Sequence, residues 1–180
     1  MSFVHLHNHT EFSMLDGAAR VGDAVAAAKA DGQPALAITD HGNMYGVLDF
    51  YKACRDAGIT PIIGTEAYMA HETRTERPAR RGRLDDSGGD TEGGRKLYYH
   101  LTLLAQDRAG YRNMIQLASR AFLEGYFYKP RVDWELLDEH SEGLIATTAC
   151  LGGHVLQSLM VGDEAGALAR AAGLQDIFAT

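Results

Sequence analysis

Two kinds of apolar run alternate along the chain: short continuous runs typical of buried strands, and longer runs with helical spacing. The short runs do not alternate with polar residues, which indicates strands covered on both faces. Glycines stand where several helical runs should end, such as Gly32 and Gly58. We predict strands over 3–6, 35–39, 60–64, 101–105 and 144–148, and helices over 21–30, 47–57, 108–123, 134–139 and, split at Gly162-Asp163, two more within 153–177.

This alternation predicts an α/β protein of about five βα units with a parallel sheet. Such units can open into a doubly wound sheet or curl into part of a barrel, and the pattern does not decide between them. A chain of 180 residues is long enough for one domain, but too short for a complete eight-fold barrel of about 250 residues. Asp107 is a suitable N-cap for the helix over 108–123.

Charge and cysteine content narrow the class of protein. The formal net charge is −7 at pH 7, which argues against a broad basic surface for nucleic acid, so any such contact is expected to be local or supplied by another domain. The two cysteines, Cys54 and Cys150, are too few for a disulfide framework and favour a reducing compartment. No apolar run approaches the length of a membrane span, and the N-terminus lacks a signal-peptide pattern. We therefore expect a cytoplasmic protein with no membrane contact.

Residues 71–96 interrupt the pattern with Gly, Arg and Asp residues and offer little that a core would accept. We predict a mobile surface insertion. The alternative is that its arginines guide a phosphate backbone toward a nearby site. The basic residues of its first part are Arg74, Arg77, Arg80, Arg81 and Arg83, and the acidic residues of its second part are Asp85, Asp86, Asp90 and Glu92.

Residues that can bind a metal stand at the ends of the predicted strands. His5, His7 and His9 close the first strand, where alternation puts them on one face. Because the C-terminal ends of parallel strands form one rim, residues at these ends are expected to meet. Any one of them alone is easily structural, but His, Asp, Glu and Cys at five successive rim positions have the composition of a metal site. The later positions are Asp40-His41, Glu66, His100 and Cys150.

Two other residues have competing interpretations. Asp16 precedes Gly17, so it is either an ordinary turn residue or a ligand that folds back over the rim. Cys54 has helical spacing with Val47 and Tyr51, which predicts a buried helix face and no function. Cys150 instead closes a strand, so we expect it to be a thiolate ligand and not a disulfide partner of Cys54.

Five motifs, in order, resemble those of the PHP (polymerase and histidinol phosphatase) superfamily. They are HLHNHTEFSMLDGA, AITDHGNMYG, PIIGTEAY, YYHLTLLA and GLIATTACLGG, and they span residues 3 to about 160. The strings S-x-L-D-G and T-D-H-G-N-M-Y-G resemble the branch found at the N-terminus of bacterial replicative DNA polymerase III alpha subunits more than histidinol phosphatases. The resemblance implies a distorted (β/α)7 barrel, here incomplete. Residues 1–180 would form a partial PHP domain, with 71–96 as an insertion and the polymerase domains absent.

The resemblance also implies a site for up to three divalent metal ions, Zn or Mn or alternatively Mg, at the C-terminal rim. Glu66 would bridge two metals, and Asp40 would orient His41. The implied chemistry is phosphoester hydrolysis, in which clustered cations polarise the phosphate and lower the pKa of a bound water. The positions that match the family's metal ligands are His7, His9, Asp16, His41, Glu66, His100 and Cys150.

In some replicative polymerases of this branch the site is a 3′–5′ proofreading exonuclease, and in others its ligands are lost and the domain is structural. Since all seven positions carry possible ligands, we expect the active type. It would act on a DNA primer 3′ end within a longer DNA-directed DNA polymerase, with other replisome subunits as partners. The alternatives are a non-catalytic scaffold that binds a separate proofreading subunit, and a stand-alone phosphatase.

The chain departs from the family after Cys150, where the expected Asp-x-His motif and its two ligands are missing. We therefore read the chain as a truncated piece of a longer polymerase. By itself it is expected to be a poor nuclease and only marginally stable.

Overall fold

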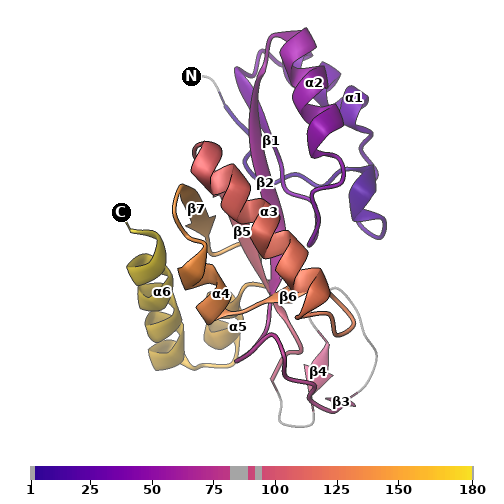
Figure 1. The fold of residues 1–180 in the computed structure, drawn as a ribbon. Helices are drawn as coiled ribbons and strands as arrows, with labels where there is room; N and C mark the ends of the chain where they lie inside the picture. The colour runs from indigo at the N-terminus through magenta and orange to yellow at the C-terminus, as the bar shows by residue number, and fades with distance from the viewer. Residues whose placement is uncertain (1–2, 82–88, 92–94, 180) are drawn as a thin grey trace.

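A computed structural model describes residues 3–81, 89–91 and 95–179 of the chain (Figure 1). The helices are α1 (Val21–Ala30), α2 (Val47–Ala57), α3 (Arg108–Leu123), α4 (Trp134–Glu139), α5 (His154–Met160) and α6 (Glu164–Phe178). A short 3-10 helix covers Glu11–Ser13. The strands are β1 (Ala35–Ile38), β2 (Thr60–Met69), β3 (Arg80–Arg81), β4 (Asp90–Thr91), β5 (Tyr99–Ala105), β6 (Arg131–Val132) and β7 (Leu144–Thr147).

The helix boundaries agree with the prediction because local capping sets them. The side chain of Asp107 accepts a hydrogen bond from the Gly110 amide at 2.9 Å and so begins α3. Gly58 ends α2 in the left-handed conformation with φ +76°. The C-terminal helices divide at Gly162-Asp163, and the Asp163 side chain caps α6.

The main sheet has the strand order β1-β2-β5-β7, and β6 pairs with the far end of β2. β1 runs parallel to β2, but β5 runs antiparallel to both β2 and β7. The prediction of a parallel sheet is therefore wrong. The reason is that the described residues between β2 and β5 (70–81, 89–91 and 95–98) contain only the short strands β3 and β4 and not the crossover helix that a parallel pair requires. The strands of the described residues form an open sheet and no closed barrel, consistent with an incomplete barrel.

The predicted first strand, residues 3–6, is not a regular strand. The segment 3–9 runs beside β1 and joins it through two backbone hydrogen bonds, from Ala37 N to His5 O at 3.0 Å and from Thr39 N to Asn8 O at 2.9 Å. A third bond, at 2.8 Å, goes from Asn8 N to the side-chain oxygen of Thr39. A side chain thus takes a place that a ladder would give to the backbone. The segment still carries His7 and His9 to the end of β1.

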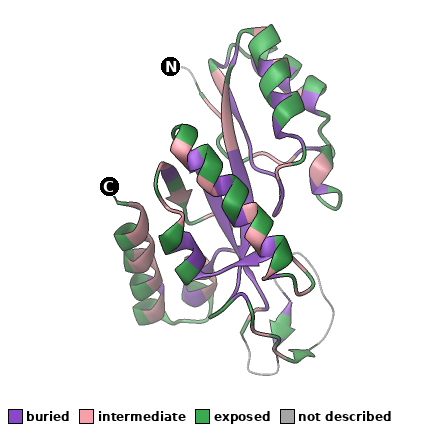
Figure 2. Ribbon diagram, viewed as in Figure 1, coloured by how far each residue is buried: buried purple, intermediate pink, exposed green. Residues whose placement is uncertain are grey.

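The two larger apolar cores among the described residues pack the helices against the strands. One lies between the sheet and helices α3 and α4, and the other lies between β1 and helices α1 and α2. Figure 2 shows the sheet largely buried, with exposed residues on the outer faces of the helices. Cys54 is fully buried in the second core, as its helical spacing predicted. Among the described residues, no helix combines the length and the apolar character needed to cross a bilayer.

Part of the 71–96 segment is anchored, contrary to the expectation that it buries little. The guanidinium of Arg74 is buried and lies 2.7 Å from Glu124, 2.9 Å from Asp133 and 3.0 Å from Glu135. The fully buried Arg131 donates hydrogen bonds to the carbonyl oxygens of Arg74 at 3.0 Å and of Glu76 at 2.6 Å. An arginine enclosed by three carboxylates cannot hold a phosphate backbone, so the guiding role is excluded for Arg74.

The rest of this segment is only partly described. Arg80 and Arg81 form the exposed strand β3, which pairs with β4. Arg77 donates hydrogen bonds to the carbonyl oxygens of Arg74, Glu76 and Glu124. The predictions made for Arg83, Asp85, Asp86 and Glu92 lie outside the described residues.

Candidate metal centre

Glu66 lies in β2 at the middle of the candidate site, and it is fully buried. The turn after β1 binds its backbone: Glu66 N donates to Asp40 O at 3.0 Å, and Gly42 N donates to Glu66 O at 2.8 Å. This pairing places His41 beside Glu66. Gly42 has φ +60°, and a side chain there would collide with the ring of Tyr68, so the turn requires glycine.

Four imidazole rings point at the Glu66 carboxylate. Its Oε2 atom lies 3.0 Å from His7 Nε2, 3.0 Å from His9 Nε2 and 3.2 Å from His41 Nδ1, and its Oε1 atom lies 3.0 Å from His100 Nδ1. One carboxylate oxygen has about two lone pairs and cannot accept well-formed hydrogen bonds from three rings. Hydrogen bonding alone therefore does not account for the three ring nitrogens that surround Glu66 Oε2.

His100 and Cys150 form the inner wall of the site. Because β5 is antiparallel to β2, the start of β5 lies beside the end of β2, and His100 pairs with Tyr68. The loop after β7 returns to the same place, where Gly152 O accepts from His100 N at 3.0 Å. The sulfur of Cys150 lies 3.6 Å from Glu66 Oε1 and 3.6 Å from His100 Nδ1. Both cysteines are free, as predicted.

Asp16 closes the outer side of the site. Its Oδ2 atom lies 2.7 Å from His41 Nε2, so the loop folds back over the rim. Side-chain exposure rises outward, from 1% for Glu66 and 5% for His100 to 32% for His7 and 37% for Asp16. The site thus has a buried side, at Glu66 and His100, and an exposed side, at His7 and Asp16.

Asp40, expected to orient His41, has other partners. Its Oδ1 atom accepts from Thr10 N and from Ser13 Oγ, both at 2.6 Å, and its Oδ2 atom accepts from Thr10 Oγ1 at 2.7 Å. In the described part of the chain, none of its hydrogen bonds goes to the His41 ring. Asp40 acts on the loop 10–16 instead, and Ser13, which the sequence analysis did not single out, links that loop to the site.

The pKa values of Glu66 and His100, the two most buried residues of the site, are shifted by their contacts. Burial would raise the pKa of Glu66, but hydrogen bonds from His100, His7 and His9 outweigh burial and hold that pKa far below its usual range. Burial would likewise lower the pKa of His100, yet its hydrogen bonds with Cys150 and Glu66 raise it to about 9. Near neutral pH Glu66 is therefore ionised and His100 protonated, and the two form an ion pair with 3.0 Å between Glu66 Oε1 and His100 Nδ1. A metal ion bound by His100 would have to displace this proton.

The donor set fits divalent metal ions. Three overlapping groups of three residues each have ligand atoms within 4.8 Å of one another: His7, His9 and Glu66; His9, Asp16 and His41; His41, Glu66 and His100. Ligands bound to one ion at about 2.0–2.2 Å lie roughly 3 Å apart, which matches the distances around Glu66. Within the described ranges, His41 Nδ1 and His100 Nε2 are buried and form no hydrogen bond, so neither nitrogen is committed to such a bond.

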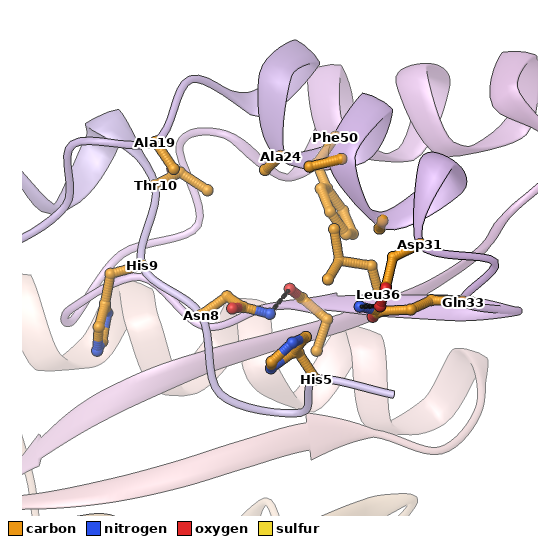
Figure 3. Close-up of a pocket in the computed structure, with 13 residues that line it drawn as sticks. His5, Asn8, His9, Thr10, Ala19, Ala24, Asp31, Gln33, Leu36 and Phe50 are labelled. Carbon is orange, nitrogen blue, oxygen red and sulfur yellow. Dashed lines mark hydrogen bonds between the residues drawn. The ribbon is translucent and has the colours of Figure 1, made fainter. Parts of the chain in front are cut away.

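His5 does not join this group. It lines a cavity of about 340 Å³ between the segment 3–9, α1 and β1. Figure 3 shows His9 at one end of this cavity and Asp31 and Gln33 at the other. Much of the lining between these ends is apolar, including Leu36 and Phe50, and offers no second cluster of ligands. The candidate metal ligands therefore lie on the side of His9 that faces Glu66.

Comparison with known proteins shows to which protein family the chain belongs. The model of the PHP domain family matches residues 5–180, and the chain belongs to this family. Several curated relatives are DNA polymerase III alpha subunits. The chain is 49% identical to that of Thermus aquaticus over 162 residues, which cover 89% of this chain and 12% of the relative. It is 48% identical to that of Deinococcus radiodurans over 180 residues, which cover 98% of this chain and 13% of the relative. The chain thus spans only a small part of these relatives.

Proposed function

We propose that this chain is the PHP region of a replicative DNA polymerase, and that its centre removes nucleotides from the 3′ end of a DNA primer by phosphoester hydrolysis. The observation that supports hydrolysis is the convergence of four histidines and Cys150 on the buried Glu66. The names of the relatives support the polymerase context.

Divalent ions, up to three and either Zn or Mn or alternatively Mg, would be held by His7, His9, Asp16, His41, Glu66, His100 and Cys150. When bound, they supply positive charge to the phosphate and lower the pKa of a water. The protein's own side chains contribute by positioning the groups of the site. The side chains of Glu66 and His100 are shielded from bulk water, and a phosphodiester would approach from the exposed side, at His7 and Asp16.

The DNA primer would be held chiefly by other parts of the polymerase, in the cytoplasm and together with other replisome subunits. The net charge of −7 gives this chain no general attraction for a phosphate backbone. A short basic patch of Arg80 and Arg81 on the exposed strand β3 offers a local contact at most.

The test compares the wild type with Glu66→Gln, and with Glu142→Gln as a control at an exposed carboxylate. Metal-free protein is titrated with Mn²⁺ and with Zn²⁺ by calorimetry. A 5′-labelled primer with a 3′ mismatch is then incubated with the longest polypeptide that the gene encodes. We expect Glu66→Gln to lose at least about tenfold in metal affinity and to abolish primer shortening, while Glu142→Gln behaves as wild type.

Equal metal binding by the wild type and Glu66→Gln would show that the cluster is not a metal centre. Tight binding by the wild type without any primer shortening would instead support the non-catalytic scaffold.

A further inference from the structure

The loop between α3 and β6 borders the candidate metal centre through the buried ring of Tyr68. This ring lies almost parallel to that of His41, with centroids 5.6 Å apart, and Lys129 Nζ lies 5.0 Å from the Tyr68 centroid. The Lys129 ammonium is therefore no farther from the His41 ring than these two distances together. A Cβ atom on Gly42 would lie 3.1 Å from Pro130 Cγ, so the loop also packs against the turn that follows β1.

The same loop holds an exposed aromatic ring in a constrained turn. The Phe127 amide donates to the Lys129 carbonyl at 3.0 Å, and Tyr128 between them has a left-handed backbone with φ +63°. Because this conformation is unfavourable for a residue with a bulky side chain, the surrounding contacts must maintain it. The Tyr128 ring is 44% exposed, and the guanidinium of Arg80, from the exposed strand β3, lies 5.2 Å from its centroid. The turn thus presents an aromatic ring and a cation together at the surface.

The charges of Lys129 and Arg80 are available to an anion. Neither side chain forms an ion pair with any residue that the structure describes, and their charged groups lie over the rings of Tyr68 and Tyr128. By contrast, Arg74 in the preceding segment is enclosed by three carboxylates. The local positive charge beside the metal centre therefore comes from Lys129 and Arg80, in a chain whose net charge is −7.

Cations next to an exposed aromatic ring suit single-stranded nucleic acid, because the cations bind phosphates and a base of any identity stacks on the ring. We propose that Arg80, Tyr128 and Lys129 form a subsite for the single-stranded DNA that leads into the metal centre. Lys129 and Arg80 bind its phosphates, and Tyr128 stacks on one of its bases. The subsite rests on the proposed function for its substrate, and it adds to that function a preference for an unpaired 3′ end, whose bases are free to stack.

The first test locates the DNA without requiring hydrolysis. A single-stranded oligonucleotide with 5-iodouracil near its 3′ end is irradiated together with the longest polypeptide that the gene encodes, without added metal, and cross-linked peptides are identified by mass spectrometry. We expect a cross-link on the peptide that contains Tyr128. It should be lost in Tyr128→Asn, which removes the ring but keeps a residue suited to the left-handed turn. The absence of a cross-link at residues 126–130 of the wild type would overturn the proposal.

Kinetics of shortening of an unmodified single-stranded oligonucleotide supply the second test. The variants are Lys129→Gln, Arg80→Gln and Lys129→Arg, which keeps the charge, with Lys52→Gln at an exposed lysine of α2 as the matched control. We expect each of the first two to raise KM about tenfold and to lower the slope of log KM against log salt by about 0.7. Lys129→Arg and Lys52→Gln should keep the wild-type slope. Wild-type KM and slope in both Lys129→Gln and Arg80→Gln would overturn the proposal.

The two tests separate this inference from the proposed function. If no oligonucleotide is shortened but the cross-link forms on Tyr128, the hydrolytic function fails and the DNA subsite stands. If shortening occurs with no cross-link at this loop and no effect of the variants on KM, the subsite fails and the hydrolytic function stands.

Discussion

Acid should destabilise this protein through His154, a histidine that the structure keeps neutral. The side chain is buried, and its ring stacks on Tyr99 with centroids 3.8 Å apart. Neither ring nitrogen has a hydrogen-bond partner among the residues that the structure describes. Burial, and then the positive charges of Arg170 and His71, lower the pKa of His154 to about 3. The folded state therefore resists a proton that the unfolded chain accepts readily.

The sign and size follow from this difference in pKa. The unfolded chain takes up the proton at a pKa of about 6.5. The contribution of His154 to stability is thus fully present above pH 6.5 and declines as the pH falls toward 3. At pH 5 the loss is about 2 kcal/mol, since 1.5 pH units below the unfolded value are worth about 1.4 kcal/mol each.

The assay is urea unfolding of metal-free protein at pH 7 and at pH 5, for the wild type and for His154→Phe, which keeps a ring against Tyr99. Other groups titrate alike in both proteins, so the difference isolates His154. We expect the wild type to lose about 2 kcal/mol more than the variant between the two pH values. The same loss in both proteins would refute the reasoning, because it would mean that the folded state accepts a proton on His154 at no cost.

Two further changes test the anchoring of residues 71–96 and the state of the cysteines. Arg74→Ala removes the ion-pair partner of one buried carboxylate, Asp133, and should lower the free energy of unfolding by about 3–5 kcal/mol. Arg95→Ala, at a surface ion pair, should cost less than about 1 kcal/mol in the same denaturation experiment. Burial raises the pKa of the Cys54 thiol to about 11, so iodoacetamide should alkylate only Cys150. Added zinc should block the alkylation of Cys150. Mass spectrometry that shows two adducts, or no protection by zinc, would contradict this prediction.

Much of the fold was predictable because its helices carry their own boundaries. Asp107 and Gly58 specify where helices begin and end through contacts within a few residues, and these contacts do not depend on the rest of the protein. Strand direction is different. An apolar run such as Leu101–Ala105 has the same composition whether it pairs parallel or antiparallel, so the reversal of β5 could not be predicted from it.

The candidate site residues lie close together in the structure despite this error in strand direction. The prediction needed His41, Glu66, His100 and Cys150 to lie at one edge of the sheet. In an antiparallel β5 the start of the strand reaches that edge, and His100 stands at the start. Had it stood at the other end, near Ala105, the same error would have removed it from the site. Whether these residues bind metal stays a prediction.

The loop 10–16 shows why a residue that holds the site in place through hydrogen bonds is harder to predict than a candidate ligand. Asp16 had two interpretations, turn residue or ligand; it lies in a turn, and its side chain lies 2.7 Å from His41. A side chain at Gly17 would collide with the carbonyl of Thr10, so the turn requires glycine, and that tight turn places Asp16 beside His41. Ser13 carries no comparable signal, since a serine between apolar residues has no pattern that predicts a partner. Its role depends on Asp40, 27 residues away, and only the folded chain brings the two together.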